Sequence, residues 1–399
     1  NGIAKKPSKP TRLTGRFYFG SGRYMEDLSR LGWLVLASFS GFGSRTLRKL
    51  RYRFGDDGER AMRASRTELL GLGVTEHATD GFLEWRSAVD HQALGRRLEA
   101  EGIRFVMKTD EEYPSYLLHS SDPPDSLFVR GATLKLKRPI AVVGTRAMSV
   151  YGSQAVRHVV GELTRAGCEV ISGLALGIDA MAHATALDAG GVTVAVLAGG
   201  VNDDAIYPRS NVQLAERILR ERGTIISEMP PGTESFRHLF PLRNRIIAGL
   251  STATIIVEAA ESSGSLLTAK LALDENRDVF AVPGPITSEQ SKGTNTLIKM
   301  GATPLLSPED VLGLFDKRHL RHVPPPRMTG EEKDILRILN RPIHIDELIR
   351  ALEEPPATVM GRLAVLELNG CITNQGAQTY MRTPRGKEAV EGDEETEED

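Results

Sequence analysis

Glycine turns with polar and basic side chains follow several apolar runs of this sequence, and this combination suits phosphate binding. Gly144, Thr145 and Arg146 come directly after the run that ends at Val143. Gly144 allows a close approach to the backbone, Thr145 offers a hydroxyl, and the Arg146 guanidinium can hold a phosphate through two hydrogen bonds. Gly173 lies in a second glycine turn before an expected helix, where free backbone amides attract anions.

More cations follow later runs, together with an aromatic side chain. Any one of these turns alone is more often structural, so the prediction depends on the whole set. A basic groove with an aromatic side chain for base stacking is typical of proteins that bind single-stranded nucleic acid, and we predict such a groove around Phe240. Its arginines would be Arg146, Arg209, Arg237, Arg243 and Arg245, with Asn211, Asn244 and Ser265 beside them.

The sequence lacks the motifs of several common enzyme classes. It has no P-loop, no HExxH, no GxSxG elbow and no GxGxxG after the first strand of the expected parallel sheet. Asp179 and His183 could bind a metal, but we favour a structural role in which Asp179 caps a helix and His183 packs inside the domain. Glu228 and Glu258 end strands and could be catalytic acids, but the sequence offers neither of them a partner base. We predict no catalytic residue, no metal and no cofactor.

The elements that would position these residues are seven short apolar runs, which alternate with segments of helical length. Strands buried on both faces of a parallel sheet have this pattern. We therefore predict a doubly wound, mostly parallel Rossmann-like α/β domain over residues 103–316, with ligands beyond the carboxyl ends of its strands. The runs are 103–107, 140–143, 169–171, 192–197, 224–226, 253–257 and 279–282.

Residues 26–100 predict a small helical module. An apolar-Gly-apolar-Gly turn within residues 36–43 precedes a basic helix at residues 45–53, and a weaker copy of the turn occupies residues 69–73. This pattern is typical of helix–hairpin–helix (SAM-like) modules, whose hairpin amides can hold a DNA phosphate. A plain helical packing domain with tight turns explains the pattern equally well, and both interpretations stay open.

The C-terminal part predicts a winged helix over residues 329–384, which a Pro-rich linker over residues 317–328 joins to the rest. Three helical patterns followed by a short hairpin are typical of this fold. The helices are expected over residues 331–339, 345–352 and 357–368, and Pro355 and Pro356 would open the third. A flexible basic arm over residues 1–25 and an acidic tail over residues 385–399 would flank the folded parts.

The charge of this winged helix argues against a duplex reader. Its third expected helix has an apolar stripe that includes Met360, and Arg362 is its single cation among several surrounding glutamates. Duplex binding needs several phosphate contacts, so we expect a module for protein contact or for support of a dimer. A weak auxiliary DNA contact through Arg362, Arg382 and Arg385 is the alternative.

Composition places the chain among ordinary folded proteins. Its 399 residues are 40% hydrophobic and 26% charged, and without residues 1–23 and 391–399 it has 44 basic and 45 acidic residues. Nucleic-acid binding would therefore need a local basic patch. The distant Cys168 and Cys371 indicate no disulfide and a reducing, cytoplasmic location. No apolar run approaches the ~18 residues of a membrane span, and the first residues lack a signal-peptide core, so we expect no membrane partner.

The motifs, taken in order, resemble those of one known family. They resemble the DNA-processing protein A family (DprA, also called Smf) over about residues 105–316, and the flanking helical module and winged helix also occur in that family. The motifs are GTR at 144–146, SGLAxGIDxxAH at 172–183, YPxxN at 207–211, FPxRNRII at 240–247, SGSLxTA at 263–269 and VPG at 282–284.

The resemblance implies a protein that is not an enzyme. It implies binding of incoming single-stranded DNA, loading of the RecA recombinase on that strand during natural transformation, and displacement or passage of single-strand-binding protein. It also implies a homodimer formed near Leu297, Ile298 and Gly301. The DNA contacts that it implies are Gly144, Thr145, Arg146, Arg209, Arg237, Phe240 and Arg243.

A nucleoside-monophosphate phosphoribohydrolase is the alternative function, because such enzymes use a related fold. They carry a PGGxGTxxE loop after a late strand, which places a glutamate against the ribose. The matching segment here, residues 258–265, lacks the PGGxGT and its glutamate. The sequence therefore favours binding over hydrolysis.

Overall fold

The computed structural model describes residues 27–315, 328–369, 371–374, 378–383 and 386. The chain divides into two compact units, Asn1–Val311 and Leu312–Asp399. The predicted basic arm lies outside the described residues, as do the predicted linker up to residue 327 and the predicted acidic tail apart from Gly386.

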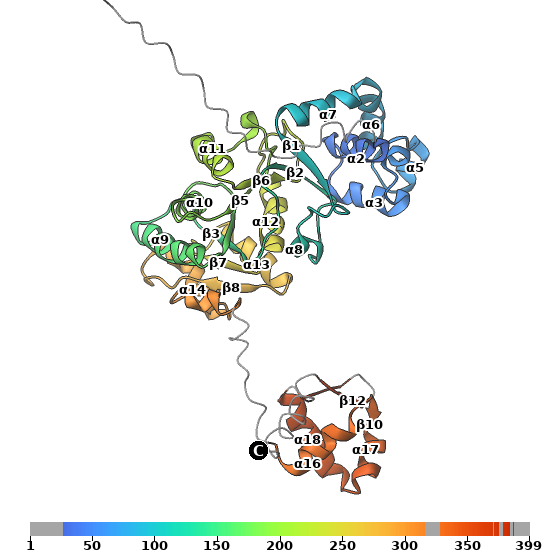
Figure 1. The fold of residues 1–399 in the computed structure, drawn as a ribbon, viewed down its shortest axis with the longest axis vertical. Helices are drawn as coiled ribbons and strands as arrows, with labels where there is room; N and C mark the ends of the chain where they lie inside the picture. Colours follow the sequence, from blue (N-terminus) through green and yellow to red (C-terminus); the bar gives the residue numbers. More distant parts are fainter. Residues whose placement is uncertain (1–26, 316–327, 370, 375–377, 384–385, 387–399) are drawn as a thin grey trace, which may run out of the picture. The chain divides into compact units, whose positions relative to one another are not determined.

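The first unit contains a nine-stranded sheet (Figure 1). Its strands are β1 (Ile103–Met107), β2 (Ser126–Gly131), β3 (Pro139–Val143), β4 (Glu169–Ser172), β5 (Thr193–Val196), β6 (Thr224–Ser227), β7 (Ala253–Ile256), β8 (Asp278–Ala281) and β9 (Thr303–Pro304). Their order across the sheet is β1-β2-β6-β5-β4-β3-β7-β8-β9. β2 pairs antiparallel with β1 and β6, and the other neighbours pair parallel.

Every predicted apolar run forms a strand, and the predicted fold class is confirmed. Sequence patterning missed β2 and β9. β2 pairs antiparallel with β1 and β6, outside the alternation of parallel strands and helices on which the prediction depends. β9 has two residues and lies at the edge of the sheet, where a strand needs little apolar sequence.

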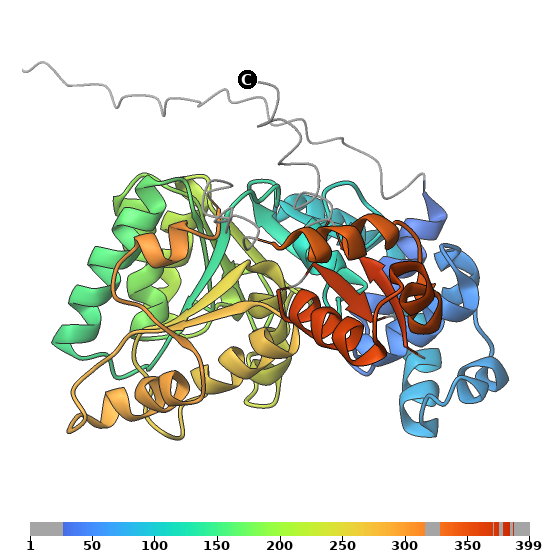
Figure 2. The ribbon, with the colours of Figure 1, turned by 90° about the horizontal axis from the view of Figure 1, so that it is seen from below.

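Helices cover both faces of the sheet, as Figures 1 and 2 show. Alternate strand residues point to opposite faces, which is the two-residue period of a strand. Ala195 belongs to the core that includes Ile218 of α11, whereas Val194 belongs to the core that includes Ile247 of α12. The helices on one face are α9 (Val150–Arg165), α10 (Ile178–Asp188) and α11 (Val212–Arg220), and those on the other include α12 (Leu239–Leu250) and α13 (Ser265–Asp274).

The chain reverses its direction across the sheet between β3 and β7. It steps outward from β3 through β4 and β5 to β6, and it then returns to β7 on the other side of β3. The turns after β3 and β7 meet at the carboxyl edge, where a hydrogen bond of 2.7 Å joins Thr145 N to the Glu258 carbonyl oxygen. Doubly wound sheets bind ligands at this position.

The N-terminal helices form a module that packs on the β1 end of the sheet. Both glycine turns noted in the sequence lie between helices, at residues 39–43 and 72–75. Phe39 and Phe42 of the first turn pack against Phe82 and Phe39 also against Trp85, so the turn is part of the module's core. The helices are α2 (Leu28–Ser38), α3 (Ser44–Phe54), α4 (Gly58–Met62), α5 (Arg66–Gly71), α6 (Glu76–Ala88) and α7 (His91–Ala100).

Three short helices complete the described part of the first unit, and the last of them ends one residue beyond it. They are α8 (Ser115–Leu118), α14 (Lys292–Lys299) and α15 (Glu309–Leu312), with single turns of 3-10 helix at Asp203–Ala205, Arg209–Asn211 and Glu289–Ser291. No helix in the described residues is long and apolar enough to cross a membrane. Cys168 and Cys371 are buried and are not joined to each other by a disulfide. The described residues contain no cluster of three or more His, Cys, Asp or Glu side chains that could hold a metal ion.

The second unit is a winged helix with its own core. Pro355 is the N-cap of the third helix and Pro356 its first residue, as the sequence predicts. Leu363 and Leu366 are buried in the core, but Met360 is exposed, so its predicted place in the apolar stripe is wrong. The elements are α16 (Gly330–Ile338), β10 (Ile343–His344), α17 (Ile345–Leu352), α18 (Pro356–Leu368), β11 (Ile372–Asn374) and β12 (Thr379–Arg382), and the sheet order is β10-β12-β11.

Candidate nucleic-acid interface

Phe240 is the centre of a group of side chains that come from three separate segments. The Arg146 guanidinium carbon lies 5.2 Å from the centroid of the Phe240 ring, and that of Arg243 lies 5.8 Å away. The Tyr207 ring lies 6.4 Å from Phe240, at an angle of 56°. We call Arg146, Tyr207, Phe240 and Arg243 the Phe240 cluster. Cations within about 6 Å of a ring are attracted to it, so the cluster combines charge with a stacking platform.

Arg146 is the cation of this cluster that is least engaged by other protein groups. It is exposed and makes no hydrogen bond or ion pair with any described residue, so its donors are available to a ligand. Thr145 is buried, and its hydroxyl accepts a hydrogen bond from Ala147 N at 3.2 Å. A Cβ at Gly144 would lie 2.7 Å from Ile178 Cγ1. Gly144 and Thr145 therefore shape the turn that presents Arg146.

Arg243 is buried and holds the edges of two strands together. Its Nη1 donates to the carbonyl oxygens of Gly173, at 2.6 Å, and Val196, at 2.7 Å, and its Nε donates to Asn244 Oδ1 at 3.1 Å. Burial, reinforced by the nearby Arg146 and opposed by Asp179, lowers the pKa of Arg243 to about 10, so it is still a cation at neutral pH. Nη2 has no acceptor among the described residues, and this donor is the part of Arg243 that a phosphate could use.

The glycine turn after β4 is fitted to this arginine. A side chain at Gly173 would collide with the Arg243 guanidinium. Gly173 N donates to Asp179 Oδ2 at 3.1 Å, and burial raises the pKa of this aspartate although Arg243 opposes the shift. Asp179 lies in the first turn of α10, but Gly177 holds the N-cap position that the sequence assigns to Asp179. The turn is thus a structural support for Arg243.

His183 packs inside the domain, as the sequence predicts. Thr193 Oγ1 donates its only proton to the Val170 carbonyl oxygen at 2.8 Å, so it accepts from His183 Nδ1 at 2.6 Å. Burial, with the nearby Arg243, lowers the pKa of His183 to about 3. His183 and Asp179 therefore face different partners, and the structure does not bring them together as metal ligands.

The segment after β5 contributes one exposed cation and one structural amide. Arg209 is exposed, and its Nη1 donates to the Asp203 carbonyl oxygen at 2.8 Å. Asn211 is buried, and its Nδ2 donates to the carbonyl oxygens of Leu174, at 2.9 Å, and Ala175, at 3.2 Å. Asn211 therefore ties this segment to the glycine turn, while Arg209 keeps donors for a ligand.

Within the described part of the chain, Arg237 and Ser265 form no hydrogen bond, ion pair or ring contact with the Phe240 cluster. Arg237 is exposed in the segment before α12 and has no partner among the described residues. Ser265 begins α13, is buried, and shares a hydrogen bond of 2.7 Å with Ser263 Oγ. No contact within the described chain joins Ser265 to the Phe240 cluster. Arg237 suits ligand binding, and Ser265 shapes the start of its helix.

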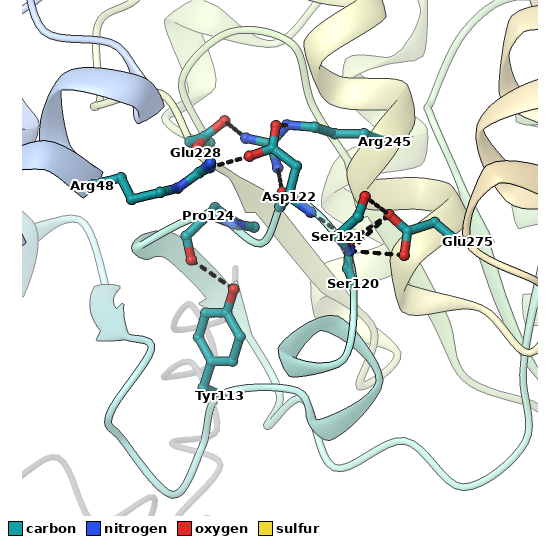
Figure 3. A network of polar contacts seen from close by, with 9 residues as sticks. All are labelled: Arg48, Tyr113, Ser120, Ser121, Asp122, Pro124, Glu228, Arg245 and Glu275. Atoms are coloured by element: carbon teal, nitrogen blue, oxygen red, sulfur yellow. Dashed lines mark hydrogen bonds and ion pairs between the residues drawn. The ribbon is translucent and has the colours of Figure 1, made fainter. Parts of the chain in front are cut away.

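Arg245 does not belong to the basic surface, contrary to the sequence analysis. It is buried; its Nη2 donates to Glu228 Oε2 at 2.5 Å, and its Nη1 donates to the Asp122 carbonyl oxygen at 2.7 Å (Figure 3). Two residues along a helix correspond to a turn of about 200°, which places Arg245 and Arg243 on opposite sides of α12. Burial raises the pKa of Glu228, and Arg245 opposes this shift.

Glu258 also has a structural role. Its carboxylate accepts hydrogen bonds from Ser149 N, at 2.9 Å, and from Ser149 Oγ, at 2.5 Å. It therefore supports the turn that presents Arg146. Both strand-end glutamates considered as acids are engaged in this way by protein partners.

Tyr207 is the residue of the cluster that the sequence analysis left out of its site. Its side chain is 50% exposed and faces Phe240. Tyr207 is the first residue of the YPxxN motif, in a segment that follows a strand. An aromatic residue in such a segment can stack on a base, so the sequence does contain a signal that predicts this residue as part of the site.

Comparison with known proteins gives relatives for most of the chain. The sequence profile described as DNA recombination-mediator protein A matches residues 104–316, and that of the DprA winged helix domain matches residues 321–378. The chain is 41% identical to DNA processing protein DprA of Bacillus subtilis over 227 residues, which are 56% of this chain and 75% of that protein. It is 43% identical to DNA processing protein DprA of Streptococcus pneumoniae over 236 residues, 59% of this chain and 82% of that protein.

A solved structure agrees with these sequence matches. The X-ray structure of DNA processing protein A from Streptococcus pneumoniae has 33% sequence identity and a TM-score of 0.59 to this chain, and the match covers 72% of this chain and 97% of that one. The profile match over residues 104–316 includes the α/β sheet whose carboxyl edge carries the Phe240 cluster.

Proposed function

The chain belongs to the DNA recombination-mediator protein A family, and from this premise we propose that it binds single-stranded DNA and loads a RecA recombinase on it. The Phe240 cluster is the observation that carries the proposal. An aromatic ring with two arginines against it offers stacking to a base and hydrogen bonds to a phosphate. A duplex keeps its bases stacked inside, so a stacking platform made of the half-buried Phe240 and the exposed Tyr207 favours a single strand.

The proposed contacts divide into two groups. Arg146, Arg209 and Arg237 are exposed and would bind phosphates directly, whereas Phe240 and Tyr207 would stack on bases. The remaining predicted site residues would position these groups. They are Gly144, Thr145, Gly173, Asn211, Arg243, Asn244 and Ser265, and Arg243 would add one donor through Nη2.

Binding is tested by titrating fluorescently labelled oligo-dT with the full chain and following anisotropy, with a duplex of equal length as the comparison. We expect tighter binding of the single strand, with an affinity that falls as salt rises, because phosphate contacts release counterions. Equal affinity for the two ligands, or no binding, would contradict the proposal.

RecA and single-strand-binding protein are the proposed partners. The family resemblance implies that the chain promotes RecA assembly on strands that single-strand-binding protein covers, as in natural transformation. The test is RecA filament formation on such covered strands with and without the chain. Faster assembly is the expected result. An unchanged rate would contradict RecA loading, whereas DNA binding is tested separately by the oligo-dT titration.

Hydrolysis of nucleoside monophosphates is the weaker alternative. Glu258 begins the segment where phosphoribohydrolases carry their motif, and here its carboxylate is engaged by Ser149. We propose that the chain is a binding protein and not an enzyme. Release of free base from nucleoside monophosphates at enzymatic rates, without DNA binding, would reverse this assignment.

A homodimer is proposed through the end of the sheet near Leu297, Ile298 and Gly301. This end has β9 as an edge strand, and Met300 and Leu306 beside it are largely exposed. An unpaired edge with exposed apolar side chains is a common surface for pairing with a second copy. Sedimentation of the full chain should give the mass of a dimer, and Met300→Glu should shift it toward the monomer.

The proposed organisation of the chain follows the sequence boundaries. It comprises an arm over 1–25, a helical module over 26–100, a DNA-binding domain over 103–316, a linker over 317–328, a winged helix over 329–384 and an acidic tail over 385–399. We propose that this protein works in the cytoplasm, a reducing compartment that suits a chain with two cysteines far apart in sequence.

A further inference from the structure

The exposed face of α3 is basic along its length. Arg45, Arg48, Lys49, Tyr52 and Arg53 are all exposed, and their spacing of three and four residues places them on one face of the helix. The opposite face is apolar and packs into the helical module. Tyr52 is 93% exposed, so its ring is free to stack on a ligand.

Protein carboxylates neutralise little of this charge. Arg48 forms an ion pair with Asp122, and Lys49 Nζ donates to the Gly73 carbonyl oxygen at 3.2 Å without meeting a carboxylate. Arg45 and Arg53 form no ion pair within the part of the chain that the structure describes, and α3 itself contains no acidic residue. Such a surface attracts a polyanion such as a phosphate backbone.

Asp122 connects this face to the helix that carries Phe240. Its carboxylate pairs with Arg48 of α3 and, at 3.3 Å, with Arg245 Nε of α12 (Figure 3). Arg245 comes five residues after Phe240, a distance of about 7.5 Å along the helix axis. The basic face of α3 and the Phe240 cluster are therefore linked through one short chain of side chains.

The loop that carries Asp122 is held in place on both sides (Figure 3). The Glu275 carboxylate accepts hydrogen bonds from Ser120 Oγ, at 2.9 Å, and from Ser121 N, at 2.9 and 3.0 Å. Tyr113 donates its hydroxyl to the Pro124 carbonyl oxygen at 2.6 Å. Asp122, which links α3 to α12, thus lies on a loop with a defined position.

We infer that a single strand bound at the Phe240 cluster continues onto the exposed face of α3, where Arg45, Lys49 and Arg53 bind phosphates and Tyr52 stacks on a base. This inference rests on the proposed function and extends its binding surface into the helical module. The three cations span about 12 Å of helix, which gives the strand several contacts beyond the cluster.

The second glycine turn of the module favours a single strand over a duplex as the occupant. A two-hairpin duplex reader offers open amides from both turns to both strands. Here Thr75 caps α6 by accepting a hydrogen bond from Ala78 N, and Glu76 and Asp80 make that helix start acidic. By contrast, Gly43 at the start of α3 makes no side-chain cap, and no acidic residue lies in the first turn.

The test uses the full chain with Arg45, Lys49 and Arg53 all changed to alanine. These side chains are exposed, and Arg48 is kept because it holds Asp122. The matched control changes three other exposed cations, Arg157, Arg220 and Lys270, which lie on the helices that cover the sheet. Affinity is measured for oligo-dT of about 6 and about 20 nucleotides, within and above common site sizes.

We expect the α3 triple variant to bind the short strand like the control and the long strand at least about tenfold more weakly. The salt slope on the long strand should fall by about two units, because each phosphate contact on a single strand contributes about 0.7. Tyr52→Ala should weaken binding of the long strand alone, with no change in slope.

Three results would overturn the inference: equal affinities of the triple variant and the control on the long strand, an equal loss on both strands, or a loss confined to a duplex of the same length. Failure of the proposed function has a different signature. In that case Phe240→Ala binds the short strand as tightly as the unchanged chain does, whatever the α3 variant shows.

Discussion

The guanidinium carbon of Arg146 lies 5.2 Å from the centroid of the Phe240 ring, although the two residues belong to different segments of the sheet edge. Arg146 follows β3 and Phe240 lies in the first turn of α12, and no shared local structure brings them together. Their proximity places a free cation beside a stacking surface. The first two predictions separate these two functions.

Arg146→Ala should weaken binding of oligo-dT by about tenfold or more, because a charge-assisted hydrogen bond contributes roughly 1.5–3 kcal/mol. The slope of log K against log salt should become shallower by about 0.7. The control is Arg96→Ala, which removes an exposed cation of α7 that pairs with Asp90. Equal affinities of the two variants across a salt titration would show that Arg146 does not contact the DNA.

Phe240→Ala should lower the affinity by roughly 1–3 kcal/mol, the usual contribution of one stacked base, and leave the salt slope nearly unchanged. Phe236→Ala is the matched control, since Phe236 is exposed in the same segment and stacks on His238 instead. Arg237→Ala should change the slope instead. If Phe240→Ala changes the slope as much as Arg237→Ala does, the assignment of stacking and charge is wrong.

Arg243→Ala should mainly destabilise the fold. The change leaves the carbonyl oxygens of Gly173 and Val196 without this donor and removes the cation beside the buried Asp179, at a cost of about 3–5 kcal/mol. Denaturant unfolding of the two arginine variants gives the measurement. Arg146→Ala should stay within about 0.5 kcal/mol of the unchanged chain. Similar stabilities of Arg146→Ala and Arg243→Ala would contradict the structural role of Arg243.

His183 should make the stability fall between pH 6.5 and pH 3. Its pKa is about 3 in the folded chain, well below the value of an unfolded histidine, so its contribution is complete above about pH 6.5 and is lost as the pH decreases. At pH 5 the loss should be about 2 kcal/mol relative to pH 7. The measurement is the difference in this loss between the unchanged chain and His183→Gln. Parallel stability curves for the two proteins would show that His183 does not titrate in this way.

Removal of the winged helix, in a chain that ends at Arg327, should retain most of the affinity for single strands. Arg362, the single cation of α18, is engaged by Glu354 at 2.6 Å and by Glu331 at 3.1 Å, which leaves that helix little free positive charge. Anisotropy titrations of the two chains give the comparison, and circular dichroism checks that the shortened chain is folded. A loss beyond about tenfold would show that the winged helix contributes to DNA binding.

The sequence by itself determined the class of fold and the edge of the sheet at which the predicted ligand-binding residues lie. Strands that are buried on both faces must be apolar throughout, so their runs stand out, and glycine turns follow them wherever the backbone packs closely. Both features are local in sequence, and the runs that form β3 and β4 therefore predicted that Arg146 and Gly173 follow strand ends.

Only the tertiary structure decided which cations are free. Arg243 and Arg245 look alike in the sequence, yet both are buried, and they turn to opposite sides of α12 because of its 3.6-residue period. Their acceptors, Gly173 and Glu228, come from distant segments and become partners only when the sheet has formed. The same reason separates Tyr207 from Ser265: both lie in segments that follow strands, but only tertiary packing places the Tyr207 ring beside Phe240 and leaves Ser265 hydrogen-bonded to Ser263.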